Sequence, residues 1–193
     1  MLRLFTAIAL PDALADELAG FATPLAGARW IEPEDMHLTL RFAGDIDNAT
    51  AREFHAGLSA IDEPAFSLRL AGFGAFGGQQ PRTLWAGVED NPWLDQLARA
   101  NERAARMAGL KPEKHGFKPH VTLARLKGTR PEAVARVLET LGAFRSAPFS
   151  VDRFSLYSSR PKVGGGPYVI EESFALRGGA DDTYAWARDP RES

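Results

Sequence analysis

The chain has 193 residues, of which 45% are hydrophobic and 25% charged, and its formal net charge is -2. This composition excludes a disordered chain, and the slight negative charge excludes a protein that coats nucleic acid by bulk electrostatics. The sequence contains no cysteine, which excludes disulfides, thiolate catalysis and sulfur-ligated metal sites. No apolar run reaches the roughly 18 residues that cross a bilayer, so we expect a cytoplasmic protein without membrane contact.

The first part of the chain reads as strands and helices in turn. An apolar run over residues 2–10 predicts a buried strand, and the Pro-Asp pair that follows opens a helix over 12–21. Alternation over 37–42 predicts a second strand, which the Gly-Asp pair at 44–45 ends. Apolar residues at helical spacing over 51–61 predict the next helix.

The rest of the chain repeats this mixture. We expect strands over 66–70, 84–88, 120–125, 149–157 and 168–176, and helices over 93–107 and 131–141. A glycine-rich loop over 72–81 and a lysine-rich loop over 109–119 connect these elements. A hairpin or flexible lid at 160–167 joins the last two strands.

Mixed strands and helices with several apparent hairpins favour an α+β fold, with helices outside largely antiparallel sheets and a groove between two halves. A His-x-Thr-Leu strand followed by a helix occurs once in each half, which suggests an internal duplication. We expect one catalytic domain over residues 1–178. Residues 179–193 show no apolar period and predict a loosely ordered tail.

The two His-x-Thr-Leu motifs carry the predicted chemistry. Residues i and i+2 of a strand share a face, so His37 points with Thr39 and His120 with Thr122. In-line attack on a phosphodiester needs one group to accept a proton from water and another to donate one to the leaving oxygen. Histidines, with an ordinary pKa of about 6.5, can fill both roles near neutral pH. Threonine hydroxyls can donate to the nonbridging oxygens, so the motifs predict a phosphodiesterase without deciding which histidine is the acid.

With these motifs the chain resembles the 2H phosphoesterase superfamily, and within it the RNA 2′,3′-cyclic phosphodiesterases, also called 2′-5′ RNA ligase-like proteins. The matching stretches are RLFTAI at 3–8, the segment from Trp-Ile at 30–31 through HLTLRFAG at 37–44, PRTLW at 81–85 and FKPHVTLAR at 117–125.

The resemblance implies a bilobal fold in which two largely antiparallel sheets, each with one motif strand, face each other across a central cleft. It also implies that no metal or cofactor is needed, that His37 is the proton donor and that His120 is the proton acceptor. The expected substrates are RNA ends or nucleotides with a 2′,3′-cyclic phosphate, opened to a 2′-phosphate. The reverse reaction would join ends through a 2′-5′ bond. Nothing in the sequence demands a protein partner, so we expect a monomer.

Three further residues are candidate substrate contacts. Arg41 shares the face of His37 if its strand runs straight. Arg125 alternates to the face opposite His120 and would reach the substrate only through a bulge or strand end after Leu123; the resemblance nevertheless favours it. Phe117 is the better candidate to stack a base, since aromatic faces hold single-stranded RNA without regard to sequence.

The loop before the second motif also carries local positive charge. Lys111, Lys114 and Lys118 with His115 form either a phosphate-attracting patch or a plain solvated loop. Among the other aromatic residues, Phe42 and Tyr157 could stack a base, whereas Trp85 is assigned to core packing.

Three alternative functions remain open. A 2H phosphodiesterase could act on a small cyclic nucleotide or an ADP-ribose cyclic phosphate. The fold could instead serve as a noncatalytic module that binds RNA ends, although both motifs are intact. A hydrolase could use a metal held by His37 with Glu34 or Asp35, but no zinc-type spacing is present.

Overall fold

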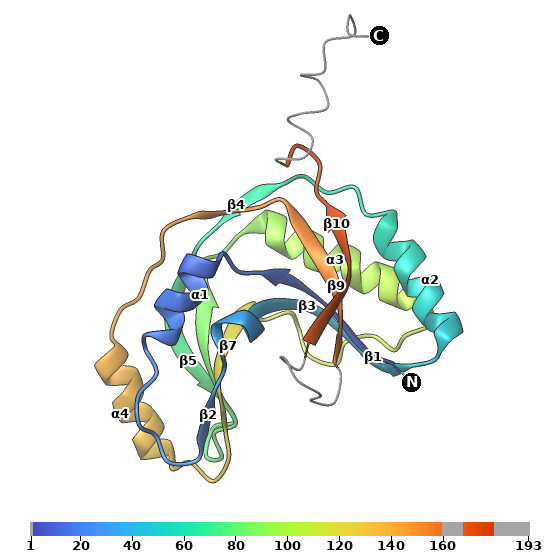
Figure 1. Ribbon diagram of the computed structural model, residues 1–193. Helices are drawn as coiled ribbons and strands as arrows, with labels where there is room; N and C mark the ends of the chain where they lie inside the picture. The colour runs from blue at the N-terminus through green and yellow to red at the C-terminus, as the bar shows by residue number, and fades with distance from the viewer. Residues whose placement is uncertain (1, 160–167, 180–193) are drawn as a thin grey trace, which may run out of the picture.

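The computed structural model describes residues 2–159 and 168–179. Within these residues the chain folds as α+β, with four α-helices against a strongly bent, antiparallel sheet (Figure 1). The expected fold class is therefore confirmed. The expectations for a lid at 160–167 and a tail beyond residue 179 lie outside the described residues.

One half of the sheet contains the first motif. Its strands run in the order β10-β9-β1-β3, and every neighbouring pair is antiparallel. Their bounds are β1 Leu2–Ala9, β3 His37–Ile46, β9 Arg153–Ser159 and β10 Tyr168–Ala175.

The other half contains the second motif. It continues in the order β7-β6-β5, and a short strand, β2, pairs with the edge of β7 opposite β6. Their bounds are β2 Ala28–Trp30, β5 Leu70–Phe76, β6 Thr83–Val88 and β7 His120–Leu126. A separate two-stranded sheet joins β4 Phe66–Leu68 to β8 Phe149–Val151.

The two halves meet at β3 and β7 through one registered pair, Leu38 with Val121. Both of these side chains are fully buried. The two expected sheets are thus joined edge to edge into one bent sheet, and the two motif strands are neighbours in it.

The four α-helices lie on the outer face of the bent sheet (Figure 1). Each α-helix begins at or beside a proline or just after a capping side chain: Asp47 accepts a hydrogen bond from Thr50 N at 2.8 Å, and Asn91 accepts from Trp93 N at 3.0 Å. The second helix begins at Asn48, three residues before the stretch expected over 51–61. The bounds are α1 Asp12–Ala19, the 3-10 turn η1 Pro33–Asp35, α2 Asn48–Ser59, α3 Pro92–Met107 and α4 Pro131–Leu141.

The expected glycine-rich loop over 72–81 is wrong in its first half, because β5 extends through it to Phe76. Gly72 sits with φ +73° where the β5–β6 register shifts, which marks a bulge. Gly74 lies under the Trp85 ring, and a Cβ there would come within 2.3 Å of Cζ2 of that ring. These glycines therefore mark a bulge and a close approach within a strand rather than a loop.

Three smaller expectations also differ from the structure. Strand β3 runs on to Ile46 through Gly44, whose φ of +78° suits only a glycine. The strand expected over 149–157 is two strands, β8 and β9, and β2 has no counterpart among the expected elements. No helix among the described residues is long and apolar enough to cross a membrane.

Candidate active site

His37 and His120 are the first residues of β3 and β7, on either side of the Leu38–Val121 pair. Counting outward from this pair in an antiparallel ladder, His37 lies across from Thr122 and His120 across from Thr39. The histidines therefore sit on a diagonal, each beside the threonine of the other motif. All four side chains are partly exposed, in contrast to the buried leucine and valine between them.

Both imidazoles are anchored in the same way. Nδ1 of His37 lies 2.8 Å from the carbonyl oxygen of Asp35, and Nδ1 of His120 lies 2.7 Å from that of Lys118. A carbonyl oxygen can only accept, so each Nδ1 carries the hydrogen and donates it. This fixes the tautomer and leaves Nε2 of each ring to exchange a proton with a substrate.

His37 is enclosed by aromatic rings. Its ring centroid lies 4.9 Å from that of Phe5, 5.8 Å from Tyr157 and 5.1 Å from Tyr168. Burial, with smaller contributions from the positive charge of Arg125 and from His120, lowers the pKa of His37 to about 4. The free protein therefore holds this imidazole neutral at pH 7.

His120 is held by a second aromatic pair. Phe76 meets its ring edge-on at 4.9 Å between centroids, and Trp85 lies at 6.3 Å. Burial again lowers the pKa, and the charge of Arg125 adds to this effect. The ring centroid of Trp85 also lies 5.1 Å from that of Phe76. Trp85 therefore does more than fill the core.

A bulge in β7 decides where Arg125 points. Thr122 pairs with Trp85 of β6, but Ala124 pairs with the adjacent Leu84, so Leu123 is the inserted residue. The insertion shifts the alternation by one and brings Arg125 onto the face of His120 and Thr122. The condition under which Arg125 could reach the substrate is therefore met. Its Nη1 lies 3.5 Å from Thr83 Oγ1, and its charge acts on both histidines.

A bulge at the matching position of β3 has the opposite effect on Arg41. Thr39 pairs with Ala7 of β1 and Arg41 with Thr6, so Leu40 is inserted. The expectation that Arg41 shares the face of His37 is wrong, because the strand does not run straight. Phe42 takes that face instead, where it is 41% exposed and stacks on Phe5 at 6.3 Å.

Arg41 is instead bound to several protein groups, although it lines the same cavity as Thr39 and His120. Its guanidinium pairs with Glu102 of α3 and, at 3.3 Å, with Glu113. It also donates to the carbonyl oxygens of Phe42 and Lys111. Only 6% of the residue is exposed, and its contacts tie the loop over 109–119 to the helix behind it. A substrate contact by Arg41 remains an untested prediction.

A cavity of about 970 Å³ opens beside His120 and Thr39, large enough for a nucleotide. Phe117 lines it and also packs against the main core, and base stacking by Phe117 remains a prediction. Three members of the expected basic patch, Lys114, His115 and Lys118, line it too. The walls also carry Asp95, Glu102 and Glu113, so the cavity is of mixed charge rather than basic.

Three residues that contact the motif histidines were not predicted as part of the site: Phe5, Phe76 and Tyr168. Phe5 lies in a continuous apolar run, where no alternation reveals which side chains leave the core, and Phe76 lies in the stretch read as a loop. The described residues contain no group of three or more His, Asp or Glu side chains arranged to hold a metal ion.

Comparisons with known proteins find relatives over most of the chain. The family model described as the 2′-5′ RNA ligase superfamily matches residues 10–162. An RNA 2′,3′-cyclic phosphodiesterase of Aeropyrum pernix is 34% identical over 149 residues, 76% of this chain and 83% of that protein. One from Thermus thermophilus is 34% identical over 194 residues, 92% of this chain and 91% of that protein.

Solved structures are similar over nearly the whole chain. A crystal structure of a Thermus thermophilus protein superposes with a TM-score of 0.75 at 28% identity, covering 91% of this chain and 98% of that one. Escherichia coli LigT in complex with 3′-AMP superposes with a TM-score of 0.72 at 26% identity, with the same coverage.

Proposed function

The chain belongs to the 2′-5′ RNA ligase superfamily, and we propose that it opens RNA 2′,3′-cyclic phosphate ends to 2′-phosphates with His37 and His120 as its acid and base. The observation that carries this proposal is the diagonal of two imidazoles, each anchored through Nδ1 and each beside a threonine hydroxyl. In-line displacement at phosphorus needs proton transfer on opposite sides of the reacting atom, and two such imidazoles can provide it.

The anionic phosphate binds between the two motif strands. The hydroxyls of Thr39 and Thr122 donate to its nonbridging oxygens, and the guanidinium of Arg125 adds a positive charge on the same face. These donors are in position before the substrate arrives, so their orientation costs little during the reaction.

Proton transfer then follows from the free Nε2 atoms. Nε2 of His120 accepts a proton from water, whose oxygen forms a new bond to phosphorus. The bond between phosphorus and the 3′ oxygen breaks, and Nε2 of His37 gives that oxygen a proton. The product is a 2′-phosphate beside a 3′-hydroxyl, with one proton taken up and one released by the pair.

The donor role requires a proton on a histidine that the free protein keeps neutral. Burial disfavours the charged form of His37, whose pKa is about 4. A phosphate anion within a few ångströms favours the charged form and raises the pKa. Substrate binding therefore favours protonation of His37, which takes up a proton as the complex forms.

With a 5′-hydroxyl in place of water as the nucleophile, the same displacement would break the bond between phosphorus and the 3′ oxygen and join two RNA ends by a 2′-5′ bond. A small cyclic nucleotide is the second candidate substrate, because the cavity beside His120 has room for one nucleotide. Both histidines, both threonines and Arg125 come from one chain, which supports action as a monomer, and the cytoplasm remains the expected location.

The decisive experiment is incubation of a short RNA ending in a 2′,3′-cyclic phosphate with the purified protein in excess EDTA. Mass and phosphatase sensitivity identify the end that forms, and His37→Ala and His120→Ala serve as matched inactive variants. We expect conversion to a 2′-phosphate by the wild type and a loss of at least about 10²-fold in each variant. A 3′-phosphate product would reverse the assignment of the leaving oxygen, and full activity in either variant would refute the pair.

A further inference from the structure

Two arginines face each other on the concave side of the sheet. Arg29 of β2 pairs directly with Arg125 of β7, and both side chains are exposed. Lys127 follows two residues after Arg125 and is also exposed, with its backbone nitrogen bonded to Gly27 O at 2.9 Å. These three residues form a line of positive charge, here called the β2–β7 basic strip.

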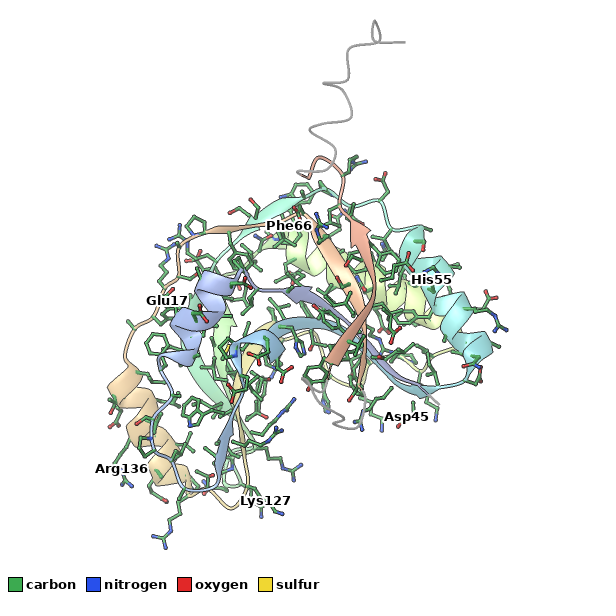
Figure 2. The ribbon with its side chains drawn as sticks, in the orientation of Figure 1. Glu17, Asp45, His55, Phe66, Lys127 and Arg136 are labelled. Carbon is green, nitrogen blue, oxygen red and sulfur yellow. The ribbon has the colours of Figure 1, made fainter. Side chains whose placement is uncertain are left out.

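The packing of the two strands fixes the direction of the strip. Trp30 and Leu126, which alternate with the basic residues, pack with Val134 of α4 in a small core on the outer face. Arg29 and Arg125 must therefore point away from α4, toward the face that carries His120. Lys127 directly follows β7, whose first residue is His120, so the strip leads away from His120 along the strand. Figure 2 shows Lys127 near the lower edge of the molecule.

This arrangement is unfavourable for the fold alone. Like charges directly opposite each other on antiparallel strands repel and reduce stability. The salt bridges found among the described residues use other arginines and leave out all three members of the strip. A bound chain of phosphates would supply the missing negative charge.

The charge on the two sides of His120 differs. The cavity carries three carboxylates among its lysines and arginines, which suits an uncharged base and sugar better than successive phosphates. The strip carries only cations and begins at Arg125, whose charge already reaches both histidines. Because the protein's net charge is -2, attraction of a polyanion must come from such a local surface.

We infer that the β2–β7 basic strip binds the backbone phosphates of single-stranded RNA on the 5′ side of the reacting end. The inference rests on the proposed function and assigns residues to the nucleotides before the reacting end, which favours an RNA chain over the small cyclic nucleotide as substrate. Arg125 binds the reacting phosphate, while Arg29 and Lys127 bind the phosphates of the preceding nucleotides.

The test compares two substrates with the same reacting group: 2′,3′-cyclic AMP and an RNA hexamer ending in adenosine 2′,3′-cyclic phosphate. The variants are Arg29→Gln, Lys127→Gln and the double change. Arg136→Gln is the control, because Arg136 is exposed on α4 on the outer side of the same half (Figure 2).

The preference is the ratio of kcat/KM for the hexamer to kcat/KM for the mononucleotide. We expect this ratio to be about tenfold lower in the double variant than in the wild type, because two phosphate contacts are gone. The slope of log kcat/KM for the hexamer against log salt should become shallower by about 0.7 for each cation removed. The thermal midpoint of Arg29→Gln should be no lower than that of the wild type, because a repulsion is relieved. The control should match the wild type in all three measurements.

Equal losses on both substrates, or an unchanged preference, would overturn the inference. If the wild type opens neither substrate, the proposed function fails and the strip is still tested by anisotropy with a labelled hexamer ending in a 2′-phosphate. Weaker binding and a shallower salt slope in the double variant support the strip in that case, and unchanged binding overturns it.

Discussion

Phe42 and Arg125 occupy equivalent positions in the two motif strands. Each is the third residue after the threonine of its own motif. Each reaches the concave face because the leucine that directly follows that threonine is inserted as a bulge. In a straight strand both would point into the core. The same backbone irregularity thus gives one half of the site an aromatic ring and the other half a cation.

Removal of the Arg125 charge should raise the pKa of both histidines. Its positive charge disfavours the imidazolium forms, so Arg125→Gln relieves that repulsion. Imidazole titration by NMR should show both pKa values higher than in the wild type, while kcat falls about 10²-fold as a phosphate donor is lost. Arg106→Gln, an exposed change on α3, should alter neither; unchanged histidine titrations in Arg125→Gln would contradict the proximity we infer.

Replacement of the leaving 3′ oxygen by sulfur should rescue one histidine variant only. A thiolate leaves without protonation, so loss of the general acid matters little with this substrate. We expect His37→Ala to approach wild-type rates on the sulfur-containing cyclic end, while His120→Ala stays impaired. Rescue of His120→Ala instead would exchange the two roles.

The depressed pKa of His37 should make the protein less stable in acid. The folded-state pKa is about 4 and the ordinary value 6.5, so the unfolded chain binds the proton more readily. The contribution of neutral His37 to stability is therefore fully present above pH 6.5 and is lost as the pH falls toward 4. Urea unfolding measures the free energy of unfolding at pH 7 and at pH 4.5. The decrease between the two pH values should be smaller for His37→Phe than for the wild type. His115→Gln, in the exposed loop, should keep the wild-type difference, and an equal decline in His37→Phe would contradict this origin.

Arg41→Met should loosen the loop that precedes His120. The change breaks a buried guanidinium pair and leaves backbone carbonyls without their donor, so we expect a loss of about 1–3 kcal/mol, less than for a fully buried pair because Glu102 and Glu113 are partly exposed. Hydrogen exchange over residues 110–118 should accelerate. Arg145→Gln, which removes an exposed pair with Glu89, should leave this loop unchanged. Unaltered exchange in Arg41→Met would show that other contacts hold it.

Gly74→Ala should disturb the second aromatic pair. The added Cβ would lie 2.3 Å from the Trp85 ring, which must then move away from its place beside His120. Overpacking of this kind costs about 1–3 kcal/mol, and kcat should fall together with a change in tryptophan fluorescence. Gly116→Ala is the matched control, since its Cβ would meet nothing within 4 Å. Wild-type fluorescence and rate in Gly74→Ala would contradict the role given to Trp85.

The sequence predicted the two motifs, the four helices and the α+β class because each depends on local periodicity or capping. It could not reveal the bulges at Leu40 and Leu123, since the choice of inserted residue is made by pairing with β1 and β6. A single insertion reverses the facing of every later residue, so alternation alone misplaced Arg41 and left Arg125 undecided. Strand β2 was missed because three residues carry too little pattern, although one of them is Arg29.

The Leu38–Val121 pair gives the site a local twofold axis. Rotation about it exchanges His37 with His120 and Thr39 with Thr122, and the two anchoring carbonyls follow the same rule. An in-line displacement has this symmetry too, since the entering and leaving oxygens are interchangeable at its midpoint. The strand register alone therefore gives the two imidazoles no preferred direction, and the difference between them comes from their surroundings. Phe42 and Arg125 are among the groups that break the symmetry, and we expect them to orient the cyclic end and so to select the oxygen that departs.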